Sequence, residues 1–141
     1  MNAFFLIAAQ LVFLPILTPP QEDYMSAIDI ENIAEYSTNA GCESSRPTVD
    51  AIVTDFGRLL KSAPASKCVE VQKANPVDPS YTLVIKASDA PRNKSARTSD
   101  TTTISKIADA ASCNAAGNDV ESMAVMLHPS VRIETACIAV Q

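Results

Sequence analysis

An apolar run near the amino terminus constrains this chain most. Almost every residue over 3–17 is apolar, and Thr18, Pro19 and Pro20 end the run before a polar, acidic stretch begins. Fifteen residues would reach about 22 Å as a helix, which is short of the roughly 30 Å hydrocarbon core of a bilayer. The run therefore fits the apolar core of a secretory signal better than a membrane span.

The interpretation of this run as a secretory signal determines the expected domain organisation. We predict a signal peptide over residues 1–25, with cleavage between Thr18 and Ala27, followed by one domain over 26–141;. The protein would then be secreted or periplasmic and would meet the membrane only transiently. No Lys or Arg precedes the run. For that reason an uncleaved leader that anchors a structural, pilin-like envelope subunit is the alternative.

The cysteines indicate the compartment. Four of them follow the leader, and an even number in an exported chain of this size predicts two structural disulfides;. The expected order of elements favours Cys42–Cys68 and Cys113–Cys137 among the three possible pairings. There is no C-x-x-C motif and a single His, so we predict neither a metal site nor a cofactor;.

Charge is unevenly distributed along the chain. Residues 21–45 hold six acids and no Lys or Arg, whereas residues 46–141 are nearly neutral. An acidic stretch at the start of the domain repels phosphates, which argues against nucleic-acid binding. The expected partner is another protein or an anionic ligand.

Hydrophobic periodicity predicts three helices. Residues 26–40 place Ile30, Ile33 and Ala34 on one side, and residues 49–60 repeat apolar positions at three- and four-residue steps after Pro47;. An Ala-rich helix is expected to begin near Asp100, to end near Gly117 and to bury four residues. These are Ile104, Ile107, Ala108 and Ala111;.

Alternation of apolar and polar residues predicts two hairpins. The first would pair residues 68–72 with 81–88, and the second would pair 123–127 with 131–137;. The order is thus α-α-β-β-α-β-β. We expect an α+β fold in which the helices pack on one face of a four-stranded antiparallel sheet, stabilised by two disulfides.

Two groups of charged residues are candidate binding surfaces. Glu31 and Glu35 would share a face of the first helix, and Arg92, Lys94 and Arg97 lie in a polar segment between a predicted strand and a predicted helix. Charged loops of this kind often carry binding function.

Catalytic motifs are missing from the sequence. His128 is the single histidine, and no nucleophile or acid stands at motif spacing from it;. We therefore predict a small exported binding module, such as an inhibitor or an immunity protein. A small secreted hydrolase that uses His128 is the alternative from a different class.

Overall fold

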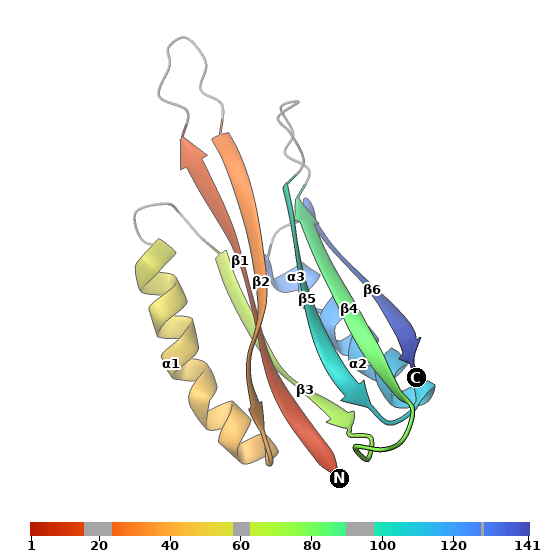
Figure 1. The fold of residues 1–141 in the computed structure, drawn as a ribbon. Helices are drawn as coiled ribbons and strands as arrows, with labels where there is room; N and C mark the ends of the chain where they lie inside the picture. The colour runs from red at the N-terminus through yellow and green to blue at the C-terminus, as the bar shows by residue number, and fades with distance from the viewer. Residues whose placement is uncertain (16–23, 58–62, 90–97, 128) are drawn as a thin grey trace.

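The computed structural model describes residues 1–15, 24–57, 63–89, 98–127 and 129–141 (Figure 1). Within these ranges the strands are β1 (Asn2–Pro15), β2 (Tyr24–Tyr36), β3 (Ala63–Gln72), β4 (Ser80–Asp89), β5 (Thr98–Ile107) and β6 (Val131–Val140). The helices are α1 (Asn39–Gly57), α2 (Ala110–Glu121) and the single turn α3 (Ala124–Leu127).

The chain builds the same ββαβ unit twice. The first unit is β1, β2, α1 and β3, with strand order β2-β1-β3, and the second is β4, β5, α2 and β6, with strand order β5-β4-β6. In each unit the first strand is central and pairs antiparallel with both neighbours. The helix therefore connects two parallel edge strands across that central strand, which is the crossover form that parallel strands need.

A disulfide closes each unit at an equivalent place. Cys42 and Cys113 are each the fourth residue of their helix. Their partners are Cys68, which lies opposite Leu6 on the central strand, and Cys137, which lies opposite Leu83. Both bridges span 6.1 Å between Cα atoms, and the pairing is the one that the sequence favoured.

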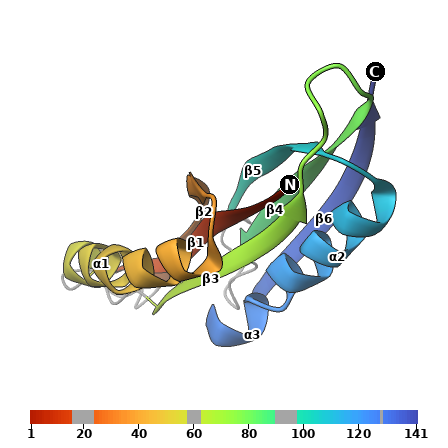
Figure 2. The same ribbon diagram turned by 90° about the horizontal axis from the view of Figure 1, so that it is seen from below.

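The first sheet is covered on both faces. Helix α1 packs on one face of this sheet, and α2 and the second sheet lie toward the other (Figure 2). Leu6 lies opposite Cys68, which is bridged to α1, whereas Phe5 and Ile7 belong to the core shared with α2 and the second sheet. Leu6 and Ile7 are consecutive, and neither exposes any of its surface. A central strand that is buried on both sides needs a continuous apolar sequence, and residues 3–9 of β1 provide one;.

The second sheet has one apolar face and one polar face. Leu83 and Ile85 of β4 point into the shared core and are fully buried, whereas Val84 is half-buried and Lys86 is exposed. Thr101 and Glu134 flank Lys86 on the neighbouring strands, and both are exposed. Polar residues on alternate positions are what a sheet with one solvated face requires.

The predicted four-stranded sheet with helices on one face is therefore wrong. In the described ranges, six strands form two three-stranded sheets. The first error is at residues 26–40, where β2 replaces the expected helix. Ile28 and Ile30 are buried while Asp29 and Glu31 are exposed, so the period is two. The spacing of Ile30, Ile33 and Ala34 also fits a helix, and cross-strand pairing with β1 decided between the two;.

Helix α1 begins earlier than its periodicity indicated. The hydroxyl of Thr38 accepts a hydrogen bond from the Gly41 N–H at 3.0 Å, which caps the helix at its amino end;. Pro47, which we expected at the start, lies inside the helix. The apolar repeat over 49–57 thus marked only the later part of a longer element, and the rest of the predicted helix, 58–60, lies outside the described residues.

The predicted helix over 100–117 divides into a strand and a helix. Ile104 and Ile107 are buried, as expected, but they belong to β5. Asp109, not Asp100, is the cap of α2, where its side chain accepts the Ser112 N–H at 2.7 Å. Gly117 lies within α2. The Thr-rich sequence 98–103 is favourable for a strand, and pairing with β4 selects that structure;.

Both predicted hairpins are wrong, although most of their strands exist. Strands β3 and β4 are consecutive, yet β3 pairs with β1 and β4 pairs with β5 and β6. The turn over 75–79 therefore connects two units and does not close a hairpin. Residues 124–127 form the short helix α3 and leave β6 to pair with β4. Alternation identifies a strand but carries no information on its partner.

The apolar run at the amino terminus supplies the central strand of the first sheet over residues 2–15. A signal peptide and a doubly buried strand share the same sequence character, so cleavage of a leader stays a prediction. Among the helices in the described ranges, none has the length and apolar content to cross a membrane.

Candidate functional site

The sequence-based candidates fall in different parts of the chain. Glu31 and Glu35 lie on β2, and both are exposed. The basic residues Arg92, Lys94 and Arg97, and also His128, lie outside the residues that the structure describes. The predictions that rest on those four residues therefore stay predictions.

Strand β2 carries an acidic face next to a small pocket. Asp29, Glu31 and Ile33 alternate along the strand and are exposed, Ile33 to 43%. Together with three residues of β1 they surround a pocket of about 60 Å³. We call this the acidic pocket; its lining residues are Ala8, Ala9, Gln10, Asp29, Glu31 and Ile33.

Glu35 does not belong to the acidic pocket. Its carboxylate lies 2.6 Å from the ammonium group of Lys73, just beyond the end of β3. Because this pair is solvent-exposed, it contributes little to stability and leaves Glu35 partly neutralised. The sequence grouped Glu31 with Glu35, but the fold places them in different environments.

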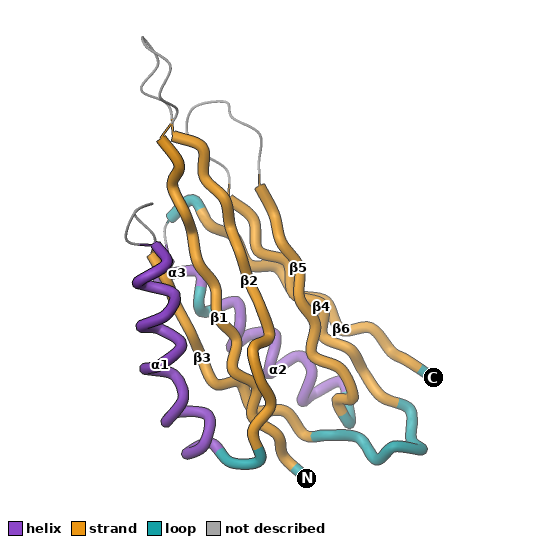
Figure 3. The backbone as a smooth tube through the Cα atoms, turned by 60° about the vertical axis from the view of Figure 1, so that its left-hand side comes forward, coloured by secondary structure: helices purple, strands orange, loops and turns teal. Residues whose placement is uncertain are grey.

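Strands β2 and β5 run side by side at the junction of the two sheets (Figure 3). The acidic pocket lies next to this junction, because Asp29 and Glu31 of its lining flank Ile30, whose N–H binds Asp100 of β5. Side chains make hydrogen bonds across this junction. The Asp100 carboxylate accepts the Ile30 N–H at 3.0 Å, and the Thr102 hydroxyl accepts the Asn32 N–H at 3.2 Å. The Asn32 amide also donates to the Thr103 carbonyl at 3.1 Å.

The two carboxyl groups at the junction, Asp29 and Asp100, have pKa values that are shifted in opposite directions. Partial burial raises the pKa of Asp29 to about 6, and a hydrogen bond to Asp100 and the negative charges of Glu31 and Asp100 act in the same direction;. Asp29 therefore holds its proton in mildly acidic solution.

Asp100 shifts the opposite way. Burial alone would raise its pKa, but hydrogen bonds from the Ile30 N–H, from Asp29 and from the Thr101 backbone outweigh burial and lower it;. Asp100 is thus the acceptor of the pair and Asp29 the donor. The two carboxyl groups share a single proton at a pH below about 6;.

Paired carboxyl groups of this kind also occur in hydrolases that activate water. Here the adjoining pocket of about 60 Å³ is far below the roughly 300 Å³ at which small-molecule sites begin;.

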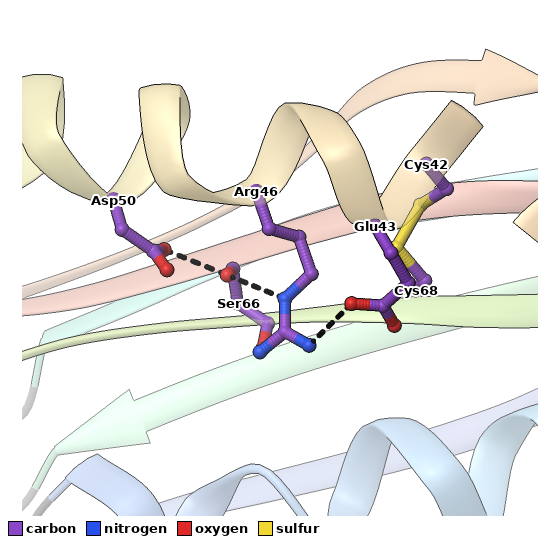
Figure 4. A network of polar contacts seen from close by, with 6 residues as sticks. All are labelled: Cys42, Glu43, Arg46, Asp50, Ser66 and Cys68. Atoms are coloured by element: carbon purple, nitrogen blue, oxygen red, sulfur yellow. Dashed lines mark hydrogen bonds and ion pairs between the residues drawn. A yellow bond between two sulfur atoms is a disulfide. The ribbon is translucent and has the colours of Figure 1, made fainter. Parts of the chain in front are cut away.

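A second polar cluster joins α1 to β3 beside the first disulfide (Figure 4). The guanidinium of Arg46 donates to the Ser66 hydroxyl at 3.3 Å and to the Ser66 carbonyl at 2.9 Å. The Ser66 hydroxyl donates to the Asp50 carboxylate at 2.7 Å, and Glu43 accepts from Arg46 at 2.9 Å.

This cluster is structural. Ser66 is 3% exposed, and its hydroxyl proton is committed to Asp50, so the group is not presented to a substrate;. Glu43, Arg46 and Asp50 share one face of α1 because they lie three and four residues apart;. The sequence did not indicate this face, because the helix was expected to start at Pro47. Their partner Ser66 could not be found without knowing that β3 lies under α1.

A larger hollow of about 300 Å³ lies between the end of β3 and α2. Its carboxylates already have partners: Glu70 accepts from the Asn2 amide at 2.6 Å, and Asp119 lies 3.5 Å from the Lys67 ammonium group. In the described part of the chain, no three His, Cys, Asp or Glu side chains are grouped so as to hold a metal ion.

Comparison with known proteins found no matching family model, no matching curated protein and no matching solved structure. The acidic pocket and the junction beside it are the candidate functional features of this chain.

Proposed function

We propose that this protein is a binding module that works in an oxidising compartment outside the cytosol. Two disulfides in a chain of 141 residues suggest such a compartment, because cytosolic thiols are kept reduced;. The bridges hold the scaffold rigid, and a rigid scaffold lowers the entropy lost when a partner binds.

The partner that fits the acidic pocket is a protein segment with an exposed Lys or Arg. The charged end of such a side chain would meet Glu31 and Asp29, and its methylene stem would pack on Ile33. The single observation that supports this proposal is the grouping of two carboxylates and an exposed Ile on a strand that lies between β1 and β5.

A direct test is an NMR titration of the protein at pH 7.5 with a Lys-rich peptide and with a Glu-rich peptide of equal length. We expect the basic peptide alone to shift the amide signals of residues 29–33. Glu31→Lys should weaken its affinity about tenfold, whereas Glu134→Lys, which reverses an exposed carboxylate on the distant strand β6, should leave it unchanged;. Equal affinity for both peptides, or an equal loss in both variants, would reject the pocket as the binding surface.

We propose secretion through a cleaved leader as the alternative to binding at the acidic pocket. The apolar residues 3–17 fit a secretory signal, and their removal would take away β1 and with it Ala8, Ala9 and Gln10, which line the pocket;. The intact mass of the mature protein distinguishes the two outcomes. A product that begins beyond Thr18 supports the cleaved signal. A product that retains residues 2–15 supports a mature protein that keeps β1 in the first sheet.

A further inference from the structure

The contact between β2 and β5 differs from the other strand contacts of the fold. Within each sheet the strands are joined by backbone ladders, whereas β2 and β5 belong to different sheets. Across this junction, side chains of β5 accept hydrogen bonds from backbone N–H groups of β2. The Asp100 carboxylate accepts from Ile30 and the Thr102 hydroxyl accepts from Asn32, so one of these two bonds depends on the state of a carboxyl group.

Each side of the junction is braced separately. Leu6 and Leu83 lie on the two central strands opposite the two bridged cysteines, so each unit keeps its own covalent closure if the junction loosens. The shared apolar core below also stays closed. Any change at the junction is therefore local, of the kind that amide exchange detects as partial opening.

We propose that the junction of β2 and β5 is a proton-sensitive latch, which the Asp29–Asp100 carboxyl pair closes in mild acid and loosens as the solution becomes neutral. With one proton between them, the two groups form a charge-assisted hydrogen bond that holds Asp100 in place to accept the Ile30 N–H;. When that proton leaves, two carboxylates face each other across the junction.

The charges around Asp29 oppose its ionisation. Glu31 on the same strand and Asp100 on β5 are both negative. On the other side, β1 places the uncharged Gln10 opposite Asp29. Of the ionic groups on α1, Glu43, Arg46 and Asp50 interact with each other or with Ser66. Among the described residues, the charges that act on Asp29 therefore add to the repulsion.

The direction of the pH effect follows from the two shifts. The pKa of Asp29 is raised from 3.8 to about 6 in the folded protein, so its contribution to stability is fully present below 3.8 and is lost as the pH rises through 6;. The pKa of Asp100 is lowered, so its contribution is lost only as the pH falls below its ordinary range;. The latch should be tightest between about pH 4 and pH 6.

Amide hydrogen exchange tests the latch at the atoms that it holds. After correction for intrinsic exchange, we expect protection of the Ile30 and Asn32 amides to fall about tenfold between pH 5 and pH 7.5. The pKa of Asp29, about 6, lies one unit above pH 5, and one pKa unit corresponds to a factor of about ten in the opening equilibrium;. Amides of the β4–β6 ladder should keep their protection and serve as the internal reference.

Two variants complete the test. Asp29→Asn retains a donor for Asp100 but does not titrate, so its Ile30 amide should stay protected at both pH values. Glu70→Gln, which alters an exposed carboxylate on β3, should keep the wild-type pH dependence. The proposal is overturned if Ile30 protection in the wild type does not change with pH, or if Asp29→Asn leaves that change intact. Neither readout involves a binding partner, so the outcome is independent of the proposed binding function.

Discussion

The two ββαβ units share their topology and differ in what covers their sheets. On the face that meets the unit's own helix, Leu6 of the first unit corresponds to Leu83 of the second, and both are fully buried. On the opposite face, Ile7 is fully buried, whereas its counterpart Val84 is half-buried.

This difference shows that topology and helix coverage are separable. The helix face is apolar in both units because each helix must bury its stripe. The second face is apolar only where another layer lies against it. The outer face of the second sheet is thus a polar surface that ends the series of packed layers, as the end unit of a repeat array does.

A charge on the second face of each sheet should give the largest contrast. Ile7→Asp places an unpaired carboxylate in the shared core and should cost about 4 kcal/mol or more of unfolding free energy, enough to prevent folding;. Val84→Asp, at the matched position on the open face, should cost less than about 1.5 kcal/mol. Urea denaturation measures both, and similar costs would contradict the assignment of the faces.

Removing either disulfide should have the next largest effect. The bridges close similar loops, with sequence separations of 26 and 24 residues, and each should contribute about 3 kcal/mol;. The double variants Cys42→Ala/Cys68→Ala and Cys113→Ala/Cys137→Ala should therefore lose comparable free energies in denaturant titrations. A bridge whose removal costs nothing would show that the two units are not equivalent.

The helix glycines should respond differently to a methyl group. A Cβ on Gly117 would lie 2.7 Å from the Thr135 hydroxyl, which donates to Glu121, so Gly117→Ala should cost about 2 kcal/mol;. A Cβ on Gly41 would lie 3.1 Å from the Thr38 hydroxyl. There the helix-favouring effect of Ala offsets a small adjustment, and Gly41→Ala should be nearly neutral. Thermal unfolding of the two variants provides the comparison.

The smallest effects are expected at the helix caps. Thr38→Ala and Asp109→Ala each remove one side-chain acceptor from the first turn of a helix and should each cost about 1 kcal/mol;. Matched Ser substitutions should recover most of that loss. If either Ala variant is as stable as the wild type, that helix does not depend on its cap.

Local features of the fold were predictable from the sequence, whereas pairing was not. Alternation marked β3, β4 and β6, and the expected order of elements favoured the observed bridges. The repeat was hidden because the units share positions but not residue types. Ala9 and Lys86, for example, lie three residues beyond Leu6 and Leu83 on the two central strands.

Among the functional features, too, those that are local in sequence were predictable and those that depend on strand pairing were not. Glu31 was identified from local charge. Asp100 was expected near a helix start, and its role at the junction required knowing that β2 and β5 run side by side, about 70 residues apart in sequence;. Such non-local pairing leaves no pattern in a single sequence.

The chain folds as two units in which β1 and β4 are the central strands. The most direct measurement is the set of cross-strand NOEs to the bridged cysteines. We predict contacts from Cys68 to Leu6 and from Cys137 to Leu83. Contacts that join residues 68–72 to residues 81–88, as in the hairpin that the sequence suggested, would contradict it.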